Sequence, residues 1–301
     1  MDARQETVEV PGARLHTERA GTGPALVLIP GGGGDAAMYE DVVPRLADRF
    51  TVITYDRRGN SRSPLASPDA SVAVSQQAAD VVAILDHYGV ERAFVFGNSS
   101  GAIIALEVLA RHAGRLLGAV VHEPPLVRLL PDSPDSPEER AMAELFRMAE
   151  QEGVMQAFAG FSAMILPDPP KLFGSRAGRA VTAGAMRVFA GGAALARGIT
   201  GRQPGGMTRL VGNTEILLRR ELPAFLYEYD PDLAALEAVT VPWCFATGRD
   251  SVGRPYHRPA HVLSERLGVP CEEFPGGHVA YQTDPEEFTA RLTAILDGFS
   301  A

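Results

Sequence analysis

Residues 92–112, RAFVFGNSSGAIIALEVLARH, place a Gly-x-Ser-x-Gly motif between an apolar run and a helical pattern. We predict a strand over Arg92–Asn98, a tight turn, and a helix over Ser100–His112. In such a unit small residues must flank the central serine, Ser99, whose hydroxyl the turn lifts into a cleft. The first N–H groups of the helix and its dipole then face any negative charge that forms beside the serine. This context favours a nucleophilic serine over an ordinary Gly/Ser-rich turn.

On both sides of this unit, apolar runs alternate with helical patterns after an N-terminal hairpin over residues 8–18. Strands are expected at residues 25–30, 50–56, 92–98, 116–122, 241–248 and 270–274, and helices at 36–48, 74–88, 100–112, 259–267 and 285–299. Such alternation predicts an α/β fold, in which helices flank a mostly parallel sheet joined by right-handed crossovers. Between these blocks the pattern becomes helical without a convincing strand. We therefore predict a sheet core over 1–125 and 235–301, with a helical cap over 126–234.

A histidine follows the last predicted strand, in the segment Pro275-Gly276-Gly277-His278. The carboxyl ends of parallel strands meet at one edge of a sheet, so His278 is expected to lie near Ser99. A serine hydroxyl becomes a good nucleophile when a neighbouring imidazole accepts its proton, which makes His278 the candidate general base. His257 and His261 are four residues apart, as metal ligands on a helix can be, but no third ligand accompanies them. We interpret that pair as surface residues.

The sequence leaves two candidates for the acid that would hold this imidazole. Glu123 ends the strand after the nucleophile helix, which returns the chain to the edge where Ser99 lies. The following Pro124-Pro125 fixes the exit of the chain, and an acid that ends a buried strand is costly unless it has a partner. Asp250, after the next predicted strand, is the alternative, although a turn aspartate is common there. The pattern favours Glu123.

Four consecutive glycines, Gly31–Gly34, follow the strand at residues 25–30. Ester hydrolysis builds a negative oxygen, and backbone N–H groups must already point at it. The N–H groups of Ser100 and Gly32 are the candidate donors.

The same loop also fits a nucleotide-binding motif. Gly31-x-Gly33-x-x-Ala36 lies between a strand and a helix, with Asp56 at the end of the next strand, as in dinucleotide-binding proteins. This alternative, a nucleotide-binding oxidoreductase, leaves Ser99 and His278 unexplained.

Composition narrows the class of protein. The 301 residues are 46% hydrophobic and 22% charged, as in ordinary globular domains. A net charge of −9, from 37 acidic and 28 basic residues, disfavours nucleic acid, which requires clustered Lys and Arg. No run is long enough for a membrane span, and the start MDARQETVEV has no apolar stretch typical of a signal peptide. With only Cys244 and Cys271 present, we expect no disulfide framework and a cytoplasmic protein.

Four segments together resemble the α/β-hydrolase superfamily, and within it the fungal zearalenone lactonases. They are Gly21–Ser63, the GNSSG turn, His122-Glu123-Pro124-Pro125 and Phe274–His278. The resemblance implies an α/β-hydrolase fold and a serine esterase or lactonase that needs no metal or organic cofactor. It also implies Glu123 as the catalytic acid and Gly32 and Ser100 as oxyanion donors. The position where a later acid usually stands in the superfamily is Ser251.

The predicted cap departs from those lactonases, which use a cap tryptophan against their substrate. Here the single tryptophan, Trp243, lies in a core strand. Cap methionines and the aromatic residues Phe146, Phe158, Phe161 and Phe189 are candidates to line an apolar pocket, although we expect most of them to pack within the cap. We therefore expect hydrolysis of an ester or lactone of an apolar small molecule. A catalytically inactive small-molecule receptor built on the same fold is a further alternative.

Overall fold

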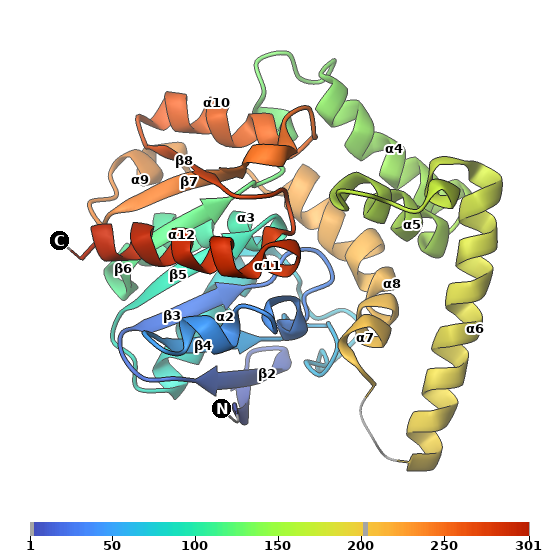
Figure 1. The fold of residues 1–301 in the computed structure, drawn as a ribbon, viewed down its shortest axis with the longest axis horizontal. Coiled ribbons are helices and arrows are strands. Elements are labelled where there is room, and N and C mark those ends of the chain that lie inside the picture. Colours follow the sequence, from blue (N-terminus) through green and yellow to red (C-terminus); the bar gives the residue numbers. More distant parts are fainter. Residues whose placement is uncertain (1–2, 201–203, 301) are drawn as a thin grey trace.

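A twisted sheet forms the centre of the computed structural model, which describes residues 3–200 and 204–300 (Figure 1). Within those residues it has eight strands in the order β1-β2-β4-β3-β5-β6-β7-β8. The strands are β1 (Arg4–Val10), β2 (Ala13–Ala20), β3 (Ala25–Ile29), β4 (Thr51–Tyr55), β5 (Ala93–Asn98), β6 (Leu116–His122), β7 (Trp243–Gly248) and β8 (Cys271–Phe274). The first pairs, β1 with β2 and β2 with β4, are antiparallel, and all other pairs are parallel.

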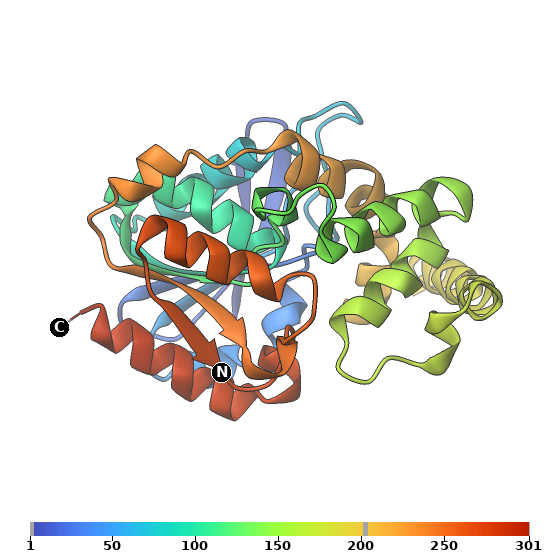
Figure 2. The same ribbon diagram turned by 90° about the horizontal axis from the view of Figure 1, so that it is seen from above.

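The central strands are buried along their whole length, because helices cover both faces of the sheet (Figure 2). One apolar cluster packs against α2 (Val74–His87), α3 (Ser100–His112) and α10 (His257–Leu267). A second cluster, on the other face, packs against α1 (Val43–Leu46), α11 (Ala280–Thr283) and α12 (Pro285–Gly298). The predicted α/β fold and its six parallel strands are confirmed. Trp243 lies buried on β7, against the ring of Phe245.

One predicted helix is wrong. Instead of a continuous helix over 36–48, the chain forms a single 3-10 turn, η1 (Ala36–Tyr39), and then the short helix α1. Asp35 caps η1 by accepting the N–H of Ala37. Pro44 lies in the first turn of α1, where a residue without an N–H is tolerated, and it prevents a continuous helix through this position.

Between β6 and β7 the described residues form helical segments and no strand (Figure 1). These are η3 (Val127–Leu129), α4 (Pro137–Gln151), α5 (Val154–Ile165), η4 (Lys171–Gly174), α6 (Arg176–Thr200), α7 (Gly206–Gly212), α8 (Thr214–Ile216), the π-helical η5 (Leu217–Glu221) and η6 (Ala224–Glu228), and α9 (Leu233–Glu237). The views in Figures 1 and 2 agree that α4, α5 and α6 stand to one side of the sheet. We call the segment 126–234 the cap. No helix in the described ranges is long and apolar enough to cross a bilayer, and both cysteines are free thiols.

Candidate active site

The turn between β5 and α3 is as tight as the motif requires. Ser99 has left-handed backbone angles, φ 57° and ψ −120°, which a residue with a side chain adopts only under strain. A Cβ added at Gly97 would lie 2.3 Å from the carbonyl oxygen of Gly101, and one at Gly101 would lie 2.3 Å from that of Ile29. Both flanking positions therefore require glycine, and the strained turn presents Ser99 at the start of a helix.

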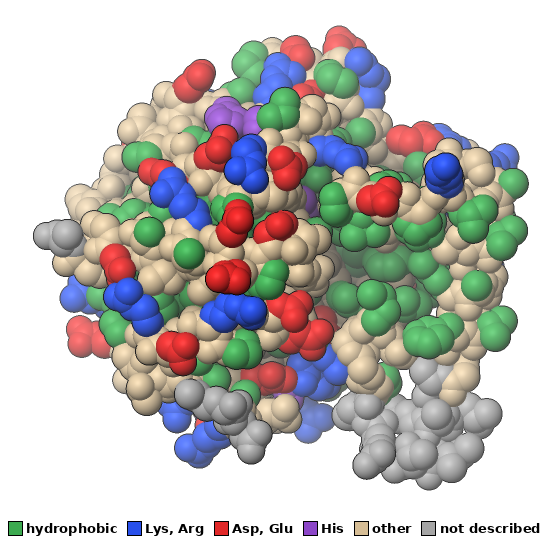
Figure 3. Space-filling view, viewed as in Figure 1, with side chains coloured by type: hydrophobic (Ala, Val, Ile, Leu, Met, Phe, Trp, Pro, Cys, Tyr) green, Lys and Arg blue, Asp and Glu red, His purple; other side chains and the backbone are tan. Residues whose placement is uncertain are grey.

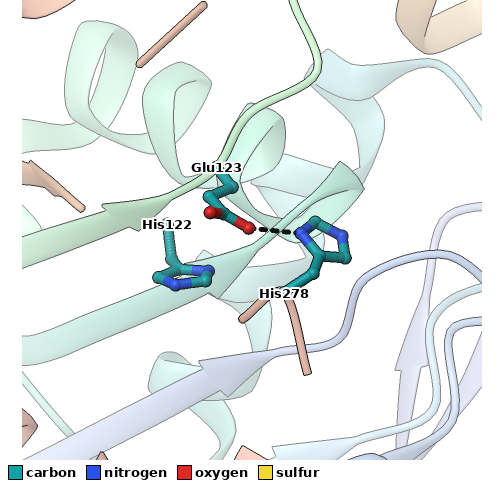
Figure 4. Close-up of side chains that lie close together, drawn as sticks. All are labelled: His122, Glu123 and His278. Carbon is teal, nitrogen blue, oxygen red and sulfur yellow. Dashed lines mark hydrogen bonds and ion pairs between the residues drawn. The ribbon is translucent and has the colours of Figure 1, made fainter. Parts of the chain in front are cut away.

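Glu123 is the acid that meets the histidine. It follows β6, is fully buried, and has a left-handed φ of 52°. Its Oε2 lies 2.6 Å from Nδ1 of His278, and its Oε1 accepts the N–H of Gly248 at 2.8 Å (Figure 4). Its own N–H donates to the carbonyl of Ala246 at 2.9 Å. The end of β7 therefore fixes both the backbone and the carboxylate of Glu123.

Two buried neighbours set the ionisation of this carboxylate. Burial would raise the pKa of Glu123, but the imidazoles of His122 and His278 outweigh burial and hold the pKa below its usual value. Burial lowers the pKa of His122 to about 4, so this ring is neutral at pH 7. Its Nδ1 lies 2.7 Å from Oδ1 of Asn98, and since an amide oxygen only accepts, Nδ1 carries the proton. At neutral pH Glu123 is thus an anion beside His278.

A backbone hydrogen bond links Ser99 to the strand that carries Glu123. Its N–H donates to the carbonyl of His122, the residue before Glu123, at 2.9 Å. The side chain of Ser99 is 7% exposed and that of His278 is 3% exposed. The described hydrogen bonds join His278 to Glu123 and do not join it directly to Ser99. Such contacts are often long in an unliganded site and shorten when substrate binds.

The alternative acid, Asp250, faces solvent. Its side chain is 63% exposed and lies 3.8 Å from Arg249, while its backbone N–H donates to the carbonyl of Gly276. The next residue, Ser251, is buried, and its hydroxyl has no hydrogen-bond partner among the described residues. The structure thus brings Glu123 rather than Asp250 to the imidazole of His278.

The glycine loop after β3 lies beside the nucleophile turn. A Cβ at Gly31 would lie 3.2 Å from Cβ of Ser99, so the loop approaches the serine closely. Gly33 and Gly34 have φ of 90° and 55°, conformations that favour glycine. Ser100 begins α3, and the first N–H groups of a helix have no carbonyl partner within it. Gly32 and Ser100 are therefore placed on the two segments that meet at Ser99.

An apolar cavity of about 270 Å³ lies between core and cap; Gly32 lines it, whereas Ser99 and His278 do not. From the cap, α5 contributes Phe158 and Phe161, as expected. Phe146 packs against Tyr227 within the cap, and Phe189 is 52% exposed, so neither of these two lines the cavity. Other lining residues are Met38, Ile165, Leu166, Pro170, Phe173, Met186, Met207, Leu210, Val211, Val279 and Tyr281, together with the polar Ser162 and Gln282. Figure 3 shows hydrophobic side chains gathered in the hollow between the two parts.

The sequence patterns did not indicate Tyr256. Its ring stacks on the imidazole of His278 with centroids 3.7 Å apart, and its hydroxyl donates to the carbonyl of Met164 at the end of α5. Tyr256 therefore joins the candidate base to the cap. The contact arises where the loops after β7 and β8 meet the end of α5, so no local sequence signal could have shown it.

The nucleotide-binding alternative is not supported by the position of Asp56. This carboxylate is fully buried. It accepts hydrogen bonds from the backbone and side chain of Arg62 and from the N–H of Ala36. Both oxygens are thus occupied and are not available to a ribose.

Two groups of residues have spacings that metal ligands can have. The donor atoms of His122, Glu123 and His278 lie within 4.8 Å of one another. Because both oxygens of Glu123 are already hydrogen-bonded, this cluster is better described as an acid holding a base (Figure 4). The rings of His257 and His261 lie 4.7 Å apart on α10, where His261 is exposed.

Known proteins share both the sequence and the fold. A family model described as alpha/beta hydrolase fold matches residues 24–168. The chain is 31% identical over 302 residues to the uncharacterized hydrolase YraK of Bacillus subtilis (strain 168), which covers 99% of this chain and 97% of that protein. A zearalenone hydrolase of Bionectria ochroleuca is 36% identical over 125 residues, 40% of this chain and 47% of that protein.

A solved structure of a thermophilic esterase from Thermogutta terrifontis has the same fold, with a TM-score of 0.70 at 18% identity over 100% of both chains. The similarity to YraK spans almost the whole length of both proteins. Together with the family model, it shows that this chain belongs to the α/β-hydrolase family.

Proposed function

We propose that this hydrolase cleaves an ester or lactone of an apolar small molecule, with Ser99 as nucleophile, His278 as general base and Glu123 as the acid that holds the base. The observation that carries the proposal is the contact of 2.6 Å between a buried carboxylate and Nδ1 of His278. It leaves Nε2 of the same ring as the atom that can accept a proton from a serine.

In the proposed reaction, Ser99 Oγ attacks the substrate carbonyl carbon while its proton passes to Nε2 of His278. The carbonyl electron pair moves onto oxygen, where the N–H groups of Gly32 and Ser100 stabilise it. Collapse of this intermediate expels the alcohol, which takes the proton from His278, and leaves an acyl group on Ser99. Water, whose proton passes to His278, then attacks the acyl carbon, and the bond to Ser99 Oγ breaks as Oγ takes that proton back, which releases the acid. The anionic Glu123 stabilises the imidazolium in both halves of the reaction.

The cavity supports an apolar substrate, because its lining is almost entirely aliphatic and aromatic. Small-molecule sites commonly combine such a lining with a few polar groups at the reacting end. Ring opening of a lactone uses the same attack, and the alcohol then stays attached to the acyl group. Because the Bionectria ochroleuca relative is a zearalenone hydrolase, zearalenone is a substrate to include in a screen.

The test is hydrolysis of p-nitrophenyl esters, simple lactones and macrolactones by the full chain, with Ser99→Ala as the matched variant. We expect Ser99→Ala to lower kcat by about 10⁴-fold or more. A fluorophosphonate should label the wild-type protein and leave the variant unlabelled. Turnover that survives in Ser99→Ala would refute the nucleophile. Absence of labelling and turnover in the wild type would favour a non-catalytic receptor.

A further inference from the structure

Arg57 holds the glycine loop at both of its ends. Its backbone N–H donates to the carbonyl of Gly34 at 2.8 Å, and its Nη2 donates to the carbonyl of Gly31 at 2.9 Å. The guanidinium is completely buried. Because glycine has little conformational preference of its own, a run of four glycines depends on outside contacts to select one conformation. Arg57 supplies two of those contacts.

The carbonyl of Gly31 accepts this hydrogen bond from Arg57 and a second one from the N–H of Gly34 at 3.0 Å, and its direction sets where the next amide points. The peptide bond between Gly31 and Gly32 is trans, since the single cis bond of the described chain lies elsewhere. In a trans peptide the C=O and N–H bonds lie in one plane and point in opposite directions. A Gly31 carbonyl directed at Arg57 therefore turns the N–H of Gly32 away from Arg57. This N–H is the donor proposed to stabilise the oxyanion.

The cap holds Arg57 in place. Nη2 also lies 2.9 Å from Oε2 of Glu221, which belongs to η5 and is 1% exposed. Asn60 donates to the second oxygen of Glu221 at 2.8 Å, and Arg57 Nη1 donates to Gln77 at 2.8 Å. A buried ion pair is costly to desolvate and often adds no stability over apolar residues. Its position between cap and glycine loop therefore favours a role in geometry.

The same cap segment borders the loop directly. Leu217, in the first turn of η5, would lie 3.3 Å from a Cβ at Gly32. Just before this helix, Asn213 donates to the carbonyl of Gly33 at 2.6 Å. Irregular π-helical turns such as η5 are frequent at functional sites. The glycine loop is thus held between Arg57 and one end of the cap.

We propose that Arg57, fixed by Glu221, is a positioning residue that orients the Gly31–Gly32 peptide for oxyanion binding and couples the cap to this step. The proposal rests on the proposed hydrolase function, because it concerns the oxyanion of that reaction. Arg57 itself touches no reacting atom.

The test replaces both members of the ion pair, because removal of one would leave a buried charge without a partner. The variant is Arg57→Met/Glu221→Met. The matched control is Arg58→Met/Asp80→Met, which removes a neighbouring buried pair. Arg58 donates to Asp80 and to the carbonyls of Pro11 and Ser71, and not to the glycine loop. The melting temperature of each variant reports the structural cost of the substitutions.

We expect Arg57→Met/Glu221→Met to lower kcat by about 10²-fold, the usual effect of losing one oxyanion donor. KM should change by no more than about threefold, because the ground-state carbonyl depends less on this donor. A trifluoromethyl ketone, to whose carbonyl carbon Ser99 Oγ adds while its proton passes to His278, should bind more weakly by a similar factor. The control should keep kcat within about threefold of wild type. Equal losses of kcat in both double variants, or a change in KM alone, would overturn the proposal.

Crystal structures of the wild type and of both double variants make the test independent of turnover. We expect the Gly31–Gly32 peptide to rotate in the Arg57 variant and to keep its orientation in the control. An unchanged peptide in the Arg57 variant would refute the positioning role even if activity were lost. If the wild-type protein cleaved no ester, the proposed function would fail, while the peptide orientation would still decide the role of Arg57.

Discussion

The carboxyl edge of the sheet and the cap that faces it are built in different ways. At the sheet edge, Ser99 and Glu123 have strained backbones, and hydrogen bonds occupy both oxygens of Glu123. The outer part of the cap leaves large side chains in solvent, with Val188 78% and Phe189 52% exposed, and the buried side chain of its Glu152 pairs with Arg147 of α4 and Arg179 of α6. The contacts at the sheet edge therefore place the candidate catalytic groups, whereas the outer cap shapes the space beside them.

The inner end of the cap belongs with the sheet edge in this respect. Arg209 of α7 donates to both oxygens of the buried Asp35, and Asn213 donates to Gly33. These charged and polar contacts hold the residues that follow α6 against the glycine loop. Within the cap, the hydrogen bonds that reach the glycine loop and Asp35 thus come from α7 and the residues directly after it.

The largest expected effect tests the sheet edge against its exposed neighbour. Glu123→Gln keeps the size of the side chain and an oxygen for Gly248, but it removes the charge that stabilises the imidazolium of His278. We expect kcat for a p-nitrophenyl ester to fall by about 10³- to 10⁴-fold. The control Asp250→Asn should stay within about threefold of wild type. If Asp250→Asn lost as much activity as Glu123→Gln, the assignment of the acid would be wrong.

Two glycines, one at the sheet edge and one in the cap, allow the two regions to be compared by the free energy of unfolding. Gly101→Ala places a Cβ 2.3 Å from the carbonyl oxygen of Ile29, a clash that only backbone movement relieves. We expect it to lower the free energy of unfolding by about 3 kcal/mol or more. Gly191→Ala, on α6, meets no atom within 4 Å and should stabilise its helix by about 0.5–1 kcal/mol. Chemical denaturation measures both, and similar effects at the two sites would contradict the contrast.

Sequence patterns predicted the sheet edge well for a physical reason. Each parallel strand is a short apolar run, and topology brings the residues after the strands to one edge. The contact of Glu123 with His278 follows from that rule, and the structure shows it. The predicted helix over 36–48 was wrong because the break at Pro44 depends on local turn chemistry that helical periodicity does not report.

The contacts between core and cap could not be predicted in this way. Arg57 and Glu221 lie 164 positions apart, and no spacing or motif relates them. The stacking of Tyr256 on His278 depends likewise on how loops from β7 and β8 meet. For the same reason the sequence did not distinguish Phe161, which lines the cavity, from Phe189, which is exposed. Local patterns specify elements, whereas such contacts are settled by packing.

The next prediction concerns pH and again separates the two regions, because residues 126–234 contain no histidine. Burial lowers the pKa of His122 from 6.5 to about 4, so between these pH values the unfolded chain binds a proton that the folded chain does not. The free energy of unfolding should therefore decrease as pH falls from 6.5 to 4, by about 3 kcal/mol from this residue. The lowered pKa of Glu123 adds a loss of stability only below about pH 4.5.

His122→Asn is the matched variant, since its amide can keep the hydrogen bond to Asn98 and does not titrate. Denaturation curves at several pH values should show a flatter dependence between pH 6.5 and 4.5 in this variant. His257→Asn, at a partly exposed position on α10, should change the slope much less. A wild-type slope that survives in His122→Asn would show that the sheet edge is not the pH-sensitive region.

The smallest expected effect concerns selectivity in the outer cap. Phe161 is 9% exposed, and its ring would lie 3.0 Å from a Cβ at Gly32, so it closes the inner end of the cavity. Phe161→Ala removes apolar contact with the substrate and leaves the sheet edge intact. We expect kcat/KM to fall by about tenfold for six-carbon chains and to stay within about threefold for acetyl esters of small alcohols. Phe189→Ala, at an exposed position, should leave kcat/KM unchanged for every substrate in the series.

Two ester series make this measurement specific. One series lengthens the acyl group with p-nitrophenol as the alcohol, and the other lengthens the alcohol with an acetyl group. The series in which Phe161→Ala loses activity with chain length identifies the part of the substrate that occupies the apolar cavity. A uniform loss across both series, including the shortest esters, would mean that Phe161 acts through the glycine loop that it touches. In that case α5, like α7, would support the glycine loop, and the part of the cap that only shapes the cavity would be smaller.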